Sequence, residues 1–385
     1  MSKETPELTG SWTMSMDLGD ATIHQYVRVH DDLKFTFFNS TEEIQTSAAS
    51  IKNDSIYLEM PVYHTHFVLV KQNNDLITGY WNNPDRGADY KILCSFQRIS
   101  DESISQRSFD GDTLTYEIMF SADTEDEYPA IGHLSESGNY LSGTFETEYG
   151  DYRFLEGSRS GDSLNLQCFD GSHAFHFSIH QPTDSLLTGV FRSGTHWEEP
   201  LQGKLNSDAS LRNPLTITSL VDDTPLDFVA MDNQGELVRF NSDQFDGKVT
   251  IIQILGSWCP NCLDESRYYK SLYEDIQNTD FQIIPVAFER SSDFTTNTIH
   301  LDAYKEELAL PYDLYLGGKA SKSVASELFP QLSSVSSFPT SIYLDREGNV
   351  RRIHTGFYGP GTGKKFERYQ VETKAFIASL LEETI

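Results

Sequence analysis

The stretch "KVTIIQILGSWCPNCLDESRYYKSLYEDIQ", residues 248–277, decides the fold of the C-terminal part of the chain. Its first eight residues form an apolar run rich in β-branched side chains, which predicts a buried strand over 248–255. Apolar side chains then recur at helical spacing, which predicts an amphipathic helix over 262–277. Between the strand and the helix, Trp258 is followed by a Cys-Pro-Asn-Cys motif, residues 259–262.

The spacing of the two motif cysteines indicates redox chemistry. A helix that opens near Pro260 places Cys259 at its N-terminus, where unpaired backbone N–H groups and the helix dipole favour a thiolate. Proline suits the first helical turn, because its missing N–H has no partner there. Cys262 then lies one turn deeper, close enough to form a disulfide with Cys259. An exposed attacking sulfur beside a shielded resolving sulfur is the arrangement that thiol–disulfide exchange needs.

The cysteine pair is also compatible with a zinc site or with two inert buried thiols. A structural zinc site usually takes a second cysteine pair or histidines at ligand spacing, whereas the remaining cysteines, Cys94 and Cys168, stand alone. The sequence favours the redox pair over both alternatives and predicts no metal site. Cys94 and Cys168 are expected to be small buried side chains, or to form a long-range disulfide if the chain is exported.

Strands and helices alternate along the rest of the C-terminal region. Parallel strands need helical crossovers, so this alternation predicts an α/β domain over residues 211–385, behind a polar linker at 206–227. The predicted elements are strands over 281–288, 340–345 and 350–356, the last two joined as a hairpin by "REGN", and helices over 297–310 and 367–383.

The first 210 residues have a different pattern. Short β-branched or aromatic runs are separated by turn compositions such as "QNND" and "SRSGD". Regular strand-and-turn spacing without a helical period predicts an all-β barrel or sandwich. The meander pattern and the "GSW" at residues 10–12 are similar to those of lipocalin-like barrels.

This β-rich part contains a weak internal repeat. "DSIYLEMPVYHTHFVLVKQNNDLITGYW" (54–81) resembles "DSLNLQCFDGSHAFHFSIHQPTDSLLTGVF" (162–191), with His66 over His176 and Gly79 over Gly189. We interpret the repeat as a duplication, which divides the region into β-rich modules at residues 1–100 and 101–210.

The charge of the chain limits its partners. Its 385 residues include 58 acidic and 29 basic side chains, and the formal net charge is −29. Such a surface repels phosphates, which argues against nucleic acid or an anionic membrane as a partner. No apolar window has the length of a membrane span, and the polar start "MSKETPELTGSW" lacks the apolar core of a signal peptide. Read literally, this start predicts a cytoplasmic protein. Alternatively, it is a mature fragment whose lipoprotein leader has been removed.

The motif also carries a family resemblance. "GKVTIIQILGSWCPNCLDE" (247–265), followed by "FPTSIYLDREGNVRRIHTGF" (338–357), resembles the TlpA/ResA-like thiol-disulfide oxidoreductases, which have a thioredoxin-like fold. The resemblance covers about residues 220–385 and includes "PLDFVAMDNQGELVRFNSDQFDGK" (225–248), which is similar to the family's N-terminal hairpin.

The resemblance implies roles for individual residues. Cys259 is then the nucleophile, Cys262 the resolving thiol and Trp258 a shield over the pair. Pro339, which follows Phe338, corresponds to the cis-proline that lies against the disulfide. Glu289, at the end of the strand 281–288, corresponds to a glutamate that tunes the acidity of the cysteines.

The same resemblance implies a function. It predicts an enzyme that exchanges disulfides with protein substrates through the redox-active Cys259–Cys262 disulfide, in the reductive direction and without an organic cofactor or metal. It also implies a periplasmic or cell-envelope location and a membrane thiol electron donor. Family members often have proline at the second intervening position, whereas here Pro260 precedes Asn261, so no redox potential is transferred.

Two alternative functions remain open. In one, the β-rich region binds a substrate and the thioredoxin-like domain is only a docking platform. In the other, the protein is a thiol peroxidase, although "QILGSWC" lacks the Pro-x-x-x-Thr/Ser-x-x-Cys setting of such enzymes.

Two further sequence features are assigned to structure. The glycine-rich "GFYGPGTGKKFERY" (356–369) does not fit a P-loop and is interpreted as a turn near the redox face. The histidines of "HTH" (64–66) and "HAFHFSIH" (173–180) are interpreted as polar side chains on sheet faces rather than ligands of a metal or haem.

Overall fold

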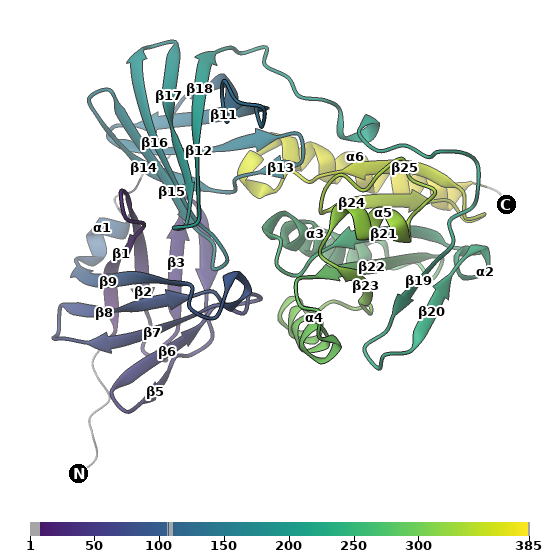
Figure 1. The fold of residues 1–385 in the computed structure, drawn as a ribbon, viewed down its shortest axis with the longest axis horizontal. Helices are drawn as coiled ribbons and strands as arrows, with labels where there is room; N and C mark the ends of the chain where they lie inside the picture. Colours follow the sequence, from purple (N-terminus) through teal and green to yellow (C-terminus); the bar gives the residue numbers. More distant parts are fainter. Residues whose placement is uncertain (1–7, 106, 108–110, 384–385) are drawn as a thin grey trace. The chain divides into compact units, whose positions relative to one another are not determined.

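The protein has two compact units (Figure 1). The computed structural model describes residues 8–105, 107 and 111–383. The first unit comprises Met1–Phe145 and Tyr152–Ser210, and the second comprises Glu146–Asp151 and Leu211–Ile385. The six residues Glu146–Asp151 therefore lie in the middle of the β-rich sequence but belong to the second unit.

The first nine strands form one antiparallel sheet, in the order β4-β3-β2-β1-β9-β8-β7-β6-β5. Alternating burial along its strands follows the alternation of apolar and polar residues in the sequence. The strands are β1 (Gly10–Asp17), β2 (Thr22–Val29), β3 (Phe35–Asn39), β4 (Glu42–Gln45), β5 (Ser50–Lys52), β6 (Ser55–Glu59), β7 (His66–Lys71), β8 (Leu76–Asn82) and β9 (Lys91–Ile99).

The next nine strands form a second sheet, in the order β11-β10-β18-β17-β16-β15-β14-β12-β13. An additional pairing of β11 with β12 closes eight of its strands into a barrel. The prediction of an all-β N-terminal region is confirmed. The strands are β10 (Thr113–Phe120), β11 (Tyr128–Ser137), β12 (Tyr140–Thr147), β13 (Gly150–Asp151), β14 (Leu155–Ser160), β15 (Ser163–Phe169), β16 (Ala174–Thr183), β17 (Leu186–Ser193) and β18 (Trp197–Leu205). The short helix η1 (Pro84–Arg86) lies between β8 and β9 in the sequence, and α1 (Asp101–Ser105) lies between the two sheets.

The internal repeat has the same strand register in both sheets. Gly79 of β8 pairs with Leu69 of β7, and Gly189 of β17 pairs with Ile179 of β16. A Cβ atom on either glycine would overlap a backbone carbonyl of the neighbouring strand, so glycine is needed at both positions. The two hairpins therefore share a specific packing requirement.

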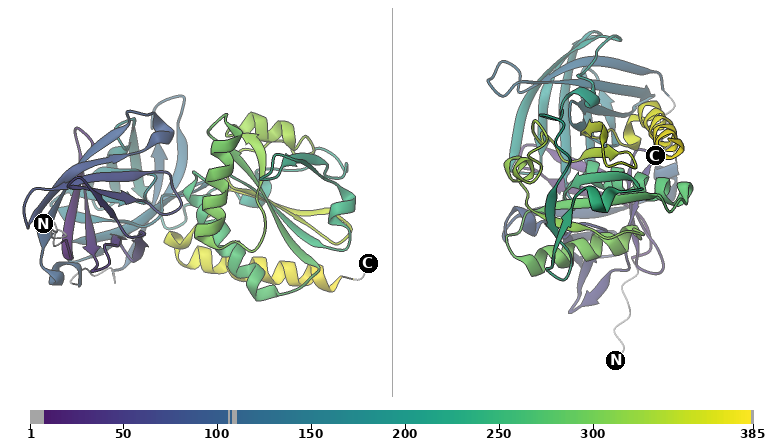
Figure 2. Two further views of the ribbon diagram at one scale, coloured as in Figure 1. Left: turned by 90° about the horizontal axis from the view of Figure 1, so that it is seen from below. Right: turned by 90° about the vertical axis from the view of Figure 1, so that its right-hand side faces the viewer.

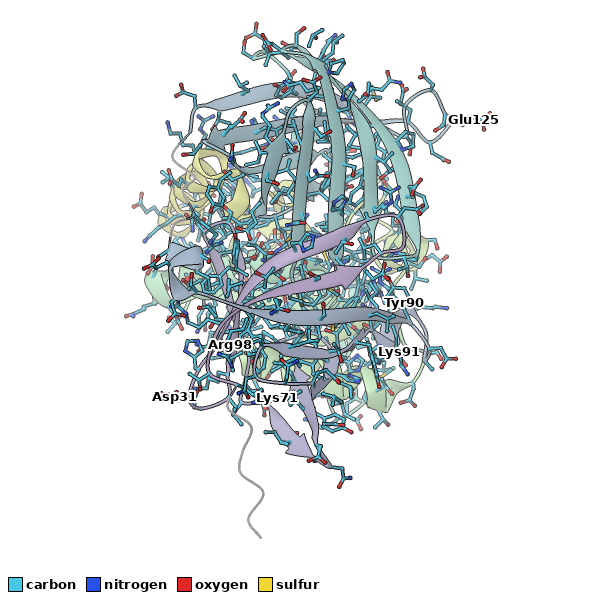
Figure 3. The ribbon with its side chains drawn as sticks, turned by 90° about the vertical axis from the view of Figure 1, so that its left-hand side faces the viewer. Asp31, Lys71, Tyr90, Lys91, Arg98 and Glu125 are labelled. Atoms are coloured by element: carbon cyan, nitrogen blue, oxygen red, sulfur yellow. The ribbon has the colours of Figure 1, made fainter. Side chains whose placement is uncertain are left out.

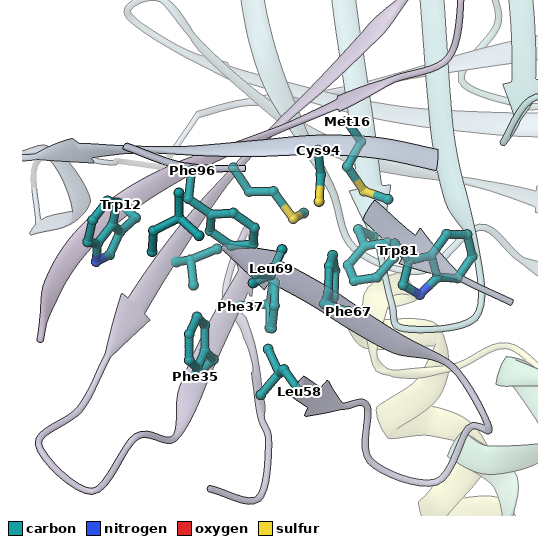
Figure 4. Close-up of a cluster of buried hydrophobic side chains, with 14 of the residues drawn as sticks. Trp12, Met16, Phe35, Phe37, Leu58, Phe67, Leu69, Trp81, Cys94 and Phe96 are labelled. Carbon is teal, nitrogen blue, oxygen red and sulfur yellow. The ribbon is translucent and has the colours of Figure 1, made fainter. Parts of the chain in front are cut away.

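The core of the first sheet is rich in aromatic rings (Figure 4). Phe37 stacks on Phe67 with ring centroids 5.6 Å apart, and Phe96 meets Phe67 edge-on. Cys94 lies in this cluster, beside Met16 on the neighbouring strand. Charged side chains such as Asp31 and Glu125 are exposed on loops of the β region (Figure 3).

The second unit is an α/β domain, as predicted. Its seven-stranded sheet has the order β20-β19-β23-β22-β21-β24-β25, with β21, β22 and β23 parallel. Helices cover both faces of this sheet (Figure 2). Side chains of α3 and α6 pack on one face and those of α5 on the other. The elements are η2 (Pro214–Thr216), β19 (Phe228–Met231), β20 (Leu237–Phe240), α2 (Ser242–Phe245), β21 (Val249–Leu255), α3 (Pro260–Ile276), β22 (Phe281–Glu289), α4 (Phe294–Leu308), β23 (Tyr315–Lys319), α5 (Lys322–Leu328), β24 (Thr340–Leu344), β25 (Val350–Thr355), η3 (Pro360–Thr362) and α6 (Lys364–Glu382).

Some predicted boundaries differ from the structure for local reasons. Helix α4 begins three residues earlier than predicted, because the Asp293 side chain caps it by accepting a hydrogen bond from the Thr296 N–H at 2.7 Å. His64 lies in the loop before β7 rather than on a strand face with His66. Within the described residues, the structure contains no helix long and apolar enough to span a membrane.

Candidate active site

The Cys-Pro-Asn-Cys motif lies at the junction of β21 and α3. Every residue of β21 is buried, because β22 and β24 flank it and helices cover its faces. Cys259 is the N-cap of α3, with Pro260 at the first helical position. The Cys259 sulfur accepts a hydrogen bond from the Cys262 N–H at 3.3 Å. A helix leaves its first N–H groups without backbone partners, so this donor is available to the sulfur.

The two motif cysteines have different environments. Cys259 is 6% exposed, whereas Cys262 is completely buried. Burial, together with the neighbouring Cys259 sulfur, raises the pKa of the Cys262 thiol well above its ordinary value. Cys262 is therefore held in the protonated form, and Cys259 is the member of the pair nearer to solvent.

Aromatic side chains frame the exposed side of the motif. The Trp258 ring packs edge-on against Phe338 with centroids 5.8 Å apart, and its indole N–H donates to the Phe288 carbonyl at 2.9 Å. The Arg290 guanidinium lies 4.6 Å from the centre of the Trp258 ring. On the other side, the Cys259 thiol donates to the Phe338 carbonyl at 3.5 Å.

The structure also brings Pro339 to this site. The peptide bond between Phe338 and Pro339 is cis, and Pro339 is buried immediately before β24. The carbonyl that receives the Cys259 thiol is therefore the one that immediately precedes this proline.

Glu289 holds the loop before the cysteines. Its side chain is 2% exposed and accepts two hydrogen bonds from Ser257, from the backbone N–H at 2.9 Å and from the hydroxyl at 2.7 Å. Ser257 stands two residues before Cys259. Glu289 is thus a buried anchor of the loop rather than a solvated carboxylate at the end of a strand.

A second buried acid, Glu265, was not among the site residues predicted from the sequence. It lies on α3 one turn after Cys262 and accepts hydrogen bonds from Gln253 at 2.9 Å, Ser341 at 3.0 Å and Tyr269 at 3.3 Å. Burial raises its pKa to about 8. Its charge also helps to raise the pKa of Cys262. Helical spacing could have indicated Glu265, because position i+3 from Cys262 is on the same helix face.

Asn261 contacts the segment Glu146–Asp151 of the same unit. With its amide oriented to satisfy both polar atoms, the nitrogen donates to the Asp151 carbonyl and the oxygen accepts from the Asp151 N–H, each at 3.2 Å. The turn that follows β25 lies beside this segment, since the Gly359 N–H donates to the Asp151 carboxylate at 2.6 Å. This turn opens the predicted glycine-rich stretch, which therefore lies next to the redox motif.

The remaining sequence candidates lie away from this site. Cys94 and Cys168 are free, buried thiols on β9 and β15, each within a hydrophobic core. His176 is buried on β16, and burial lowers its pKa to about 4. No group of three or more His, Cys, Asp or Glu side chains in the described part of the chain is placed to hold a metal ion.

Comparison with known protein families gives a match over the region that contains this site. Residues 220–368 match the family model described as Redoxin, and this unit has a thioredoxin-like fold. No curated protein matched the chain.

Several solved structures are similar to part of this chain. One is a putative protein disulfide isomerase from Bacteroides thetaiotaomicron, at 18% identity over 45% of this chain and 96% of that one, with a TM-score of 0.32. A second is a secreted thiol-disulfide isomerase from Corynebacterium glutamicum, at 16% identity over 46% of this chain and 98% of that one, with a TM-score of 0.34. A third is StoA from Bacillus subtilis, at 20% identity over 40% of this chain and 99% of that one, with a TM-score of 0.28.

Proposed function

We propose that the protein is a thiol-disulfide oxidoreductase that reduces disulfides of protein substrates through Cys259 and Cys262. The observation that supports this most strongly is the geometry of the pair. Cys259 caps α3 and accepts a hydrogen bond from the Cys262 N–H, while Cys262 is buried one turn behind it. The hydrogen bond and the helix terminus stabilise negative charge on the Cys259 sulfur, which is the form that attacks a disulfide.

The reaction proceeds in two exchanges. The Cys259 thiolate attacks one sulfur of the substrate disulfide, so that a mixed disulfide forms and the other substrate sulfur leaves as a thiolate. Cys262 then loses its proton and attacks the Cys259 sulfur. The Cys259–Cys262 disulfide forms, and the second substrate sulfur leaves. The two leaving thiolates take up two protons. The substrate has gained two electrons, which the enzyme pair has lost.

Cys262 must lose its proton before the second exchange, and its surroundings control this step. Its raised pKa keeps it unreactive until the mixed disulfide removes the negative charge from Cys259. We assign Glu265 a positioning role here, because its charge raises the Cys262 pKa and its own pKa is about 8. The ionisation of Glu265 therefore changes how readily Cys262 reacts near neutral pH.

An insulin reduction assay with dithiothreitol tests the function. We expect wild-type protein to accelerate insulin precipitation, Cys259→Ser to fall to the uncatalysed rate, and Cys262→Ser to accumulate a mixed disulfide that is visible by mass spectrometry. Cys168→Ser serves as the matched control and should keep wild-type activity. Equal rates for wild type and Cys259→Ser would remove the proposed function.

The direction of exchange is part of the proposal. Equilibration of the Cys259–Cys262 couple with glutathione buffers measures its reduction potential. A value near that of thioredoxin, about −270 mV, supports a reductase, and a value near about −120 mV supports an oxidant. The motif's resemblance to TlpA/ResA-like proteins supports a reductase in the periplasm or cell envelope that a membrane thiol donor re-reduces. Fractionation of cells that express the full-length gene tests the location.

A further inference from the structure

The segment Glu146–Asp151 is attached to the redox unit by contacts with residues far away in the sequence. It forms the tip of the β12–β13 hairpin, where the Thr147 hydroxyl donates to the Gly150 carbonyl at 3.1 Å. The rest of its unit begins only at Leu211. A turn in the middle of a β-rich sequence has no local reason to join another unit. Its contacts with distant residues of the second unit must therefore hold it there.

The first set of contacts is with the redox motif itself. Asn261, which stands between the two cysteines, pairs its side-chain amide with both the N–H and the carbonyl of Asp151. This is how a neighbouring β-strand pairs with one residue of an extended chain. Gly150 has a φ of 154°, and a Cβ there would overlap the Asn261 side chain. The fit between the segment and the motif thus depends on glycine.

The second set of contacts comes from the turn after β25. Gly150 forms a parallel bridge with Phe357, and the Tyr358 hydroxyl donates to the Thr147 carbonyl at 2.8 Å. Gly356 has a φ of 79°, and a Cβ on it would lie 2.6 Å from the Tyr149 carbonyl oxygen. The Asn261 amide on one side, and the Phe357 backbone with the Tyr358 hydroxyl on the other, therefore pair with backbone groups of the segment as they would with a bound peptide.

Charged groups also hold the segment, at Glu146 and at Glu148. Lys365 donates to the buried Glu146 carboxylate at 2.6 Å. Arg212 makes two hydrogen bonds to Glu148, both at 2.5 Å, where the arginine side chain is 56% exposed. The Arg212 pair is more exposed than the Lys365 pair, and both add to the contacts that hold the segment.

An extended polypeptide that carries a disulfide to Cys259 also brings backbone N–H and carbonyl groups, which are the kind of partner that the Asn261 amide has in Asp151. In this protein the segment Glu146–Asp151 already occupies those groups. We propose that this segment is a resident part of the redox site that determines substrate specificity: it closes the Asn261 side to extended chains and leaves Cys259 to disulfides that approach from the Trp258 and Phe338 side. The inference rests on the proposed function, which it refines.

The test compares two disulfide substrates in the full-length protein. Gly150→Val removes the conformational freedom and the space that docking requires. We expect its kcat/KM for insulin to rise roughly tenfold, the equivalent of losing two hydrogen bonds, while kcat/KM for oxidised glutathione stays within twofold. Lys374→Gln, which removes an exposed ion pair with Asp275 that does not involve the segment, should change neither value. An equal change for both substrates, or no change for either, overturns the proposal.

A second measurement does not depend on catalysis. Alkylation of Cys259 is followed by mass spectrometry with iodoacetamide and with a maleimide attached to polyethylene glycol. We expect Gly150→Val and, separately, Asn261→Leu to accelerate the bulky reagent about tenfold and the small one less than twofold. If neither variant changes the ratio, the specificity role is wrong even where insulin reduction succeeds. If the ratio changes in a protein without reductase activity, only the proposed function fails.

Discussion

Two cysteines of this protein are equally buried and yet lie in opposite chemical settings. Cys94 in the first sheet and Cys259 in the second unit are each 6% exposed. Cys94 lies on β9, where its backbone pairs with Met16 on one side and Gly79 on the other, so the N–H groups of this region take part in the sheet. Cys259 lies at the start of α3, where the Cys262 N–H is free to donate to its sulfur. Backbone position, rather than burial, separates the two thiols.

The comparison predicts a large difference in reactivity. Burial raises the pKa of Cys94 to about 12, so that at pH 7 only about 10⁻⁵ of it is thiolate, roughly a thousandfold less than for a free cysteine. We expect iodoacetamide at pH 7 to modify Cys259 in the reduced native protein and to leave Cys94 intact. Peptide mapping by mass spectrometry after timed quenching gives the two rates. Similar alkylation rates at Cys94 and Cys259 would show that backbone position does not separate the two thiols.

The second prediction concerns Glu265, whose burial raises its pKa from an unfolded value of about 4.5 to about 8. The folded state then binds the Glu265 proton more tightly than the unfolded state does. Its contribution to the free energy of unfolding therefore decreases as the pH rises from about 4.5 to about 8, by up to about 1.4 kcal/mol per unit of pKa shift. Glu265→Gln removes this dependence.

Urea unfolding at pH 5, 7 and 9 measures this effect. The variant should lose less stability than the wild type between pH 5 and pH 9. Taking the difference between the two proteins cancels other shifted groups, such as His354, whose pKa burial lowers to about 4. Parallel pH profiles for the two proteins would show that Glu265 is not the titrating group.

The contrast between Cys94 and Cys259 also shows what the sequence can specify. The local pattern around the motif predicted the strand, the helix and the N-terminal place of Cys259, because each depends on neighbours within a few residues. Strand β23 was missed, since its two glycines weaken the strand pattern. Gly317 is needed there because a Cβ would lie 2.7 Å from the Phe288 ring. That packing reason is visible only in three dimensions.

The same limit applies to the site. Glu265 was within reach of helical periodicity, but its partners Gln253 and Ser341 are on two different strands. The docking of Asp151 on Asn261 joins residues 110 positions apart, and no local pattern marks it. Contacts of this kind depend on tertiary packing, which the spacing of residue types along the chain does not encode.

The smallest predicted effect is the most specific test of the difference between Cys94 and Cys259. Serine and alanine should change the free energy of unfolding in opposite order at the two positions. At Cys259, serine keeps an acceptor for the Cys262 N–H and alanine removes it, so Cys259→Ala should be less stable than Cys259→Ser by about 1 kcal/mol. At Cys94, serine places a hydroxyl in an apolar core without a free partner, so Cys94→Ser should be less stable than Cys94→Ala by about 1–3 kcal/mol. Urea unfolding of the four reduced variants measures the free energy of unfolding of each and gives the order at both positions. The same order of serine and alanine at both positions would mean that burial alone governs these thiols, and that the helix terminus contributes nothing measurable to the setting of Cys259.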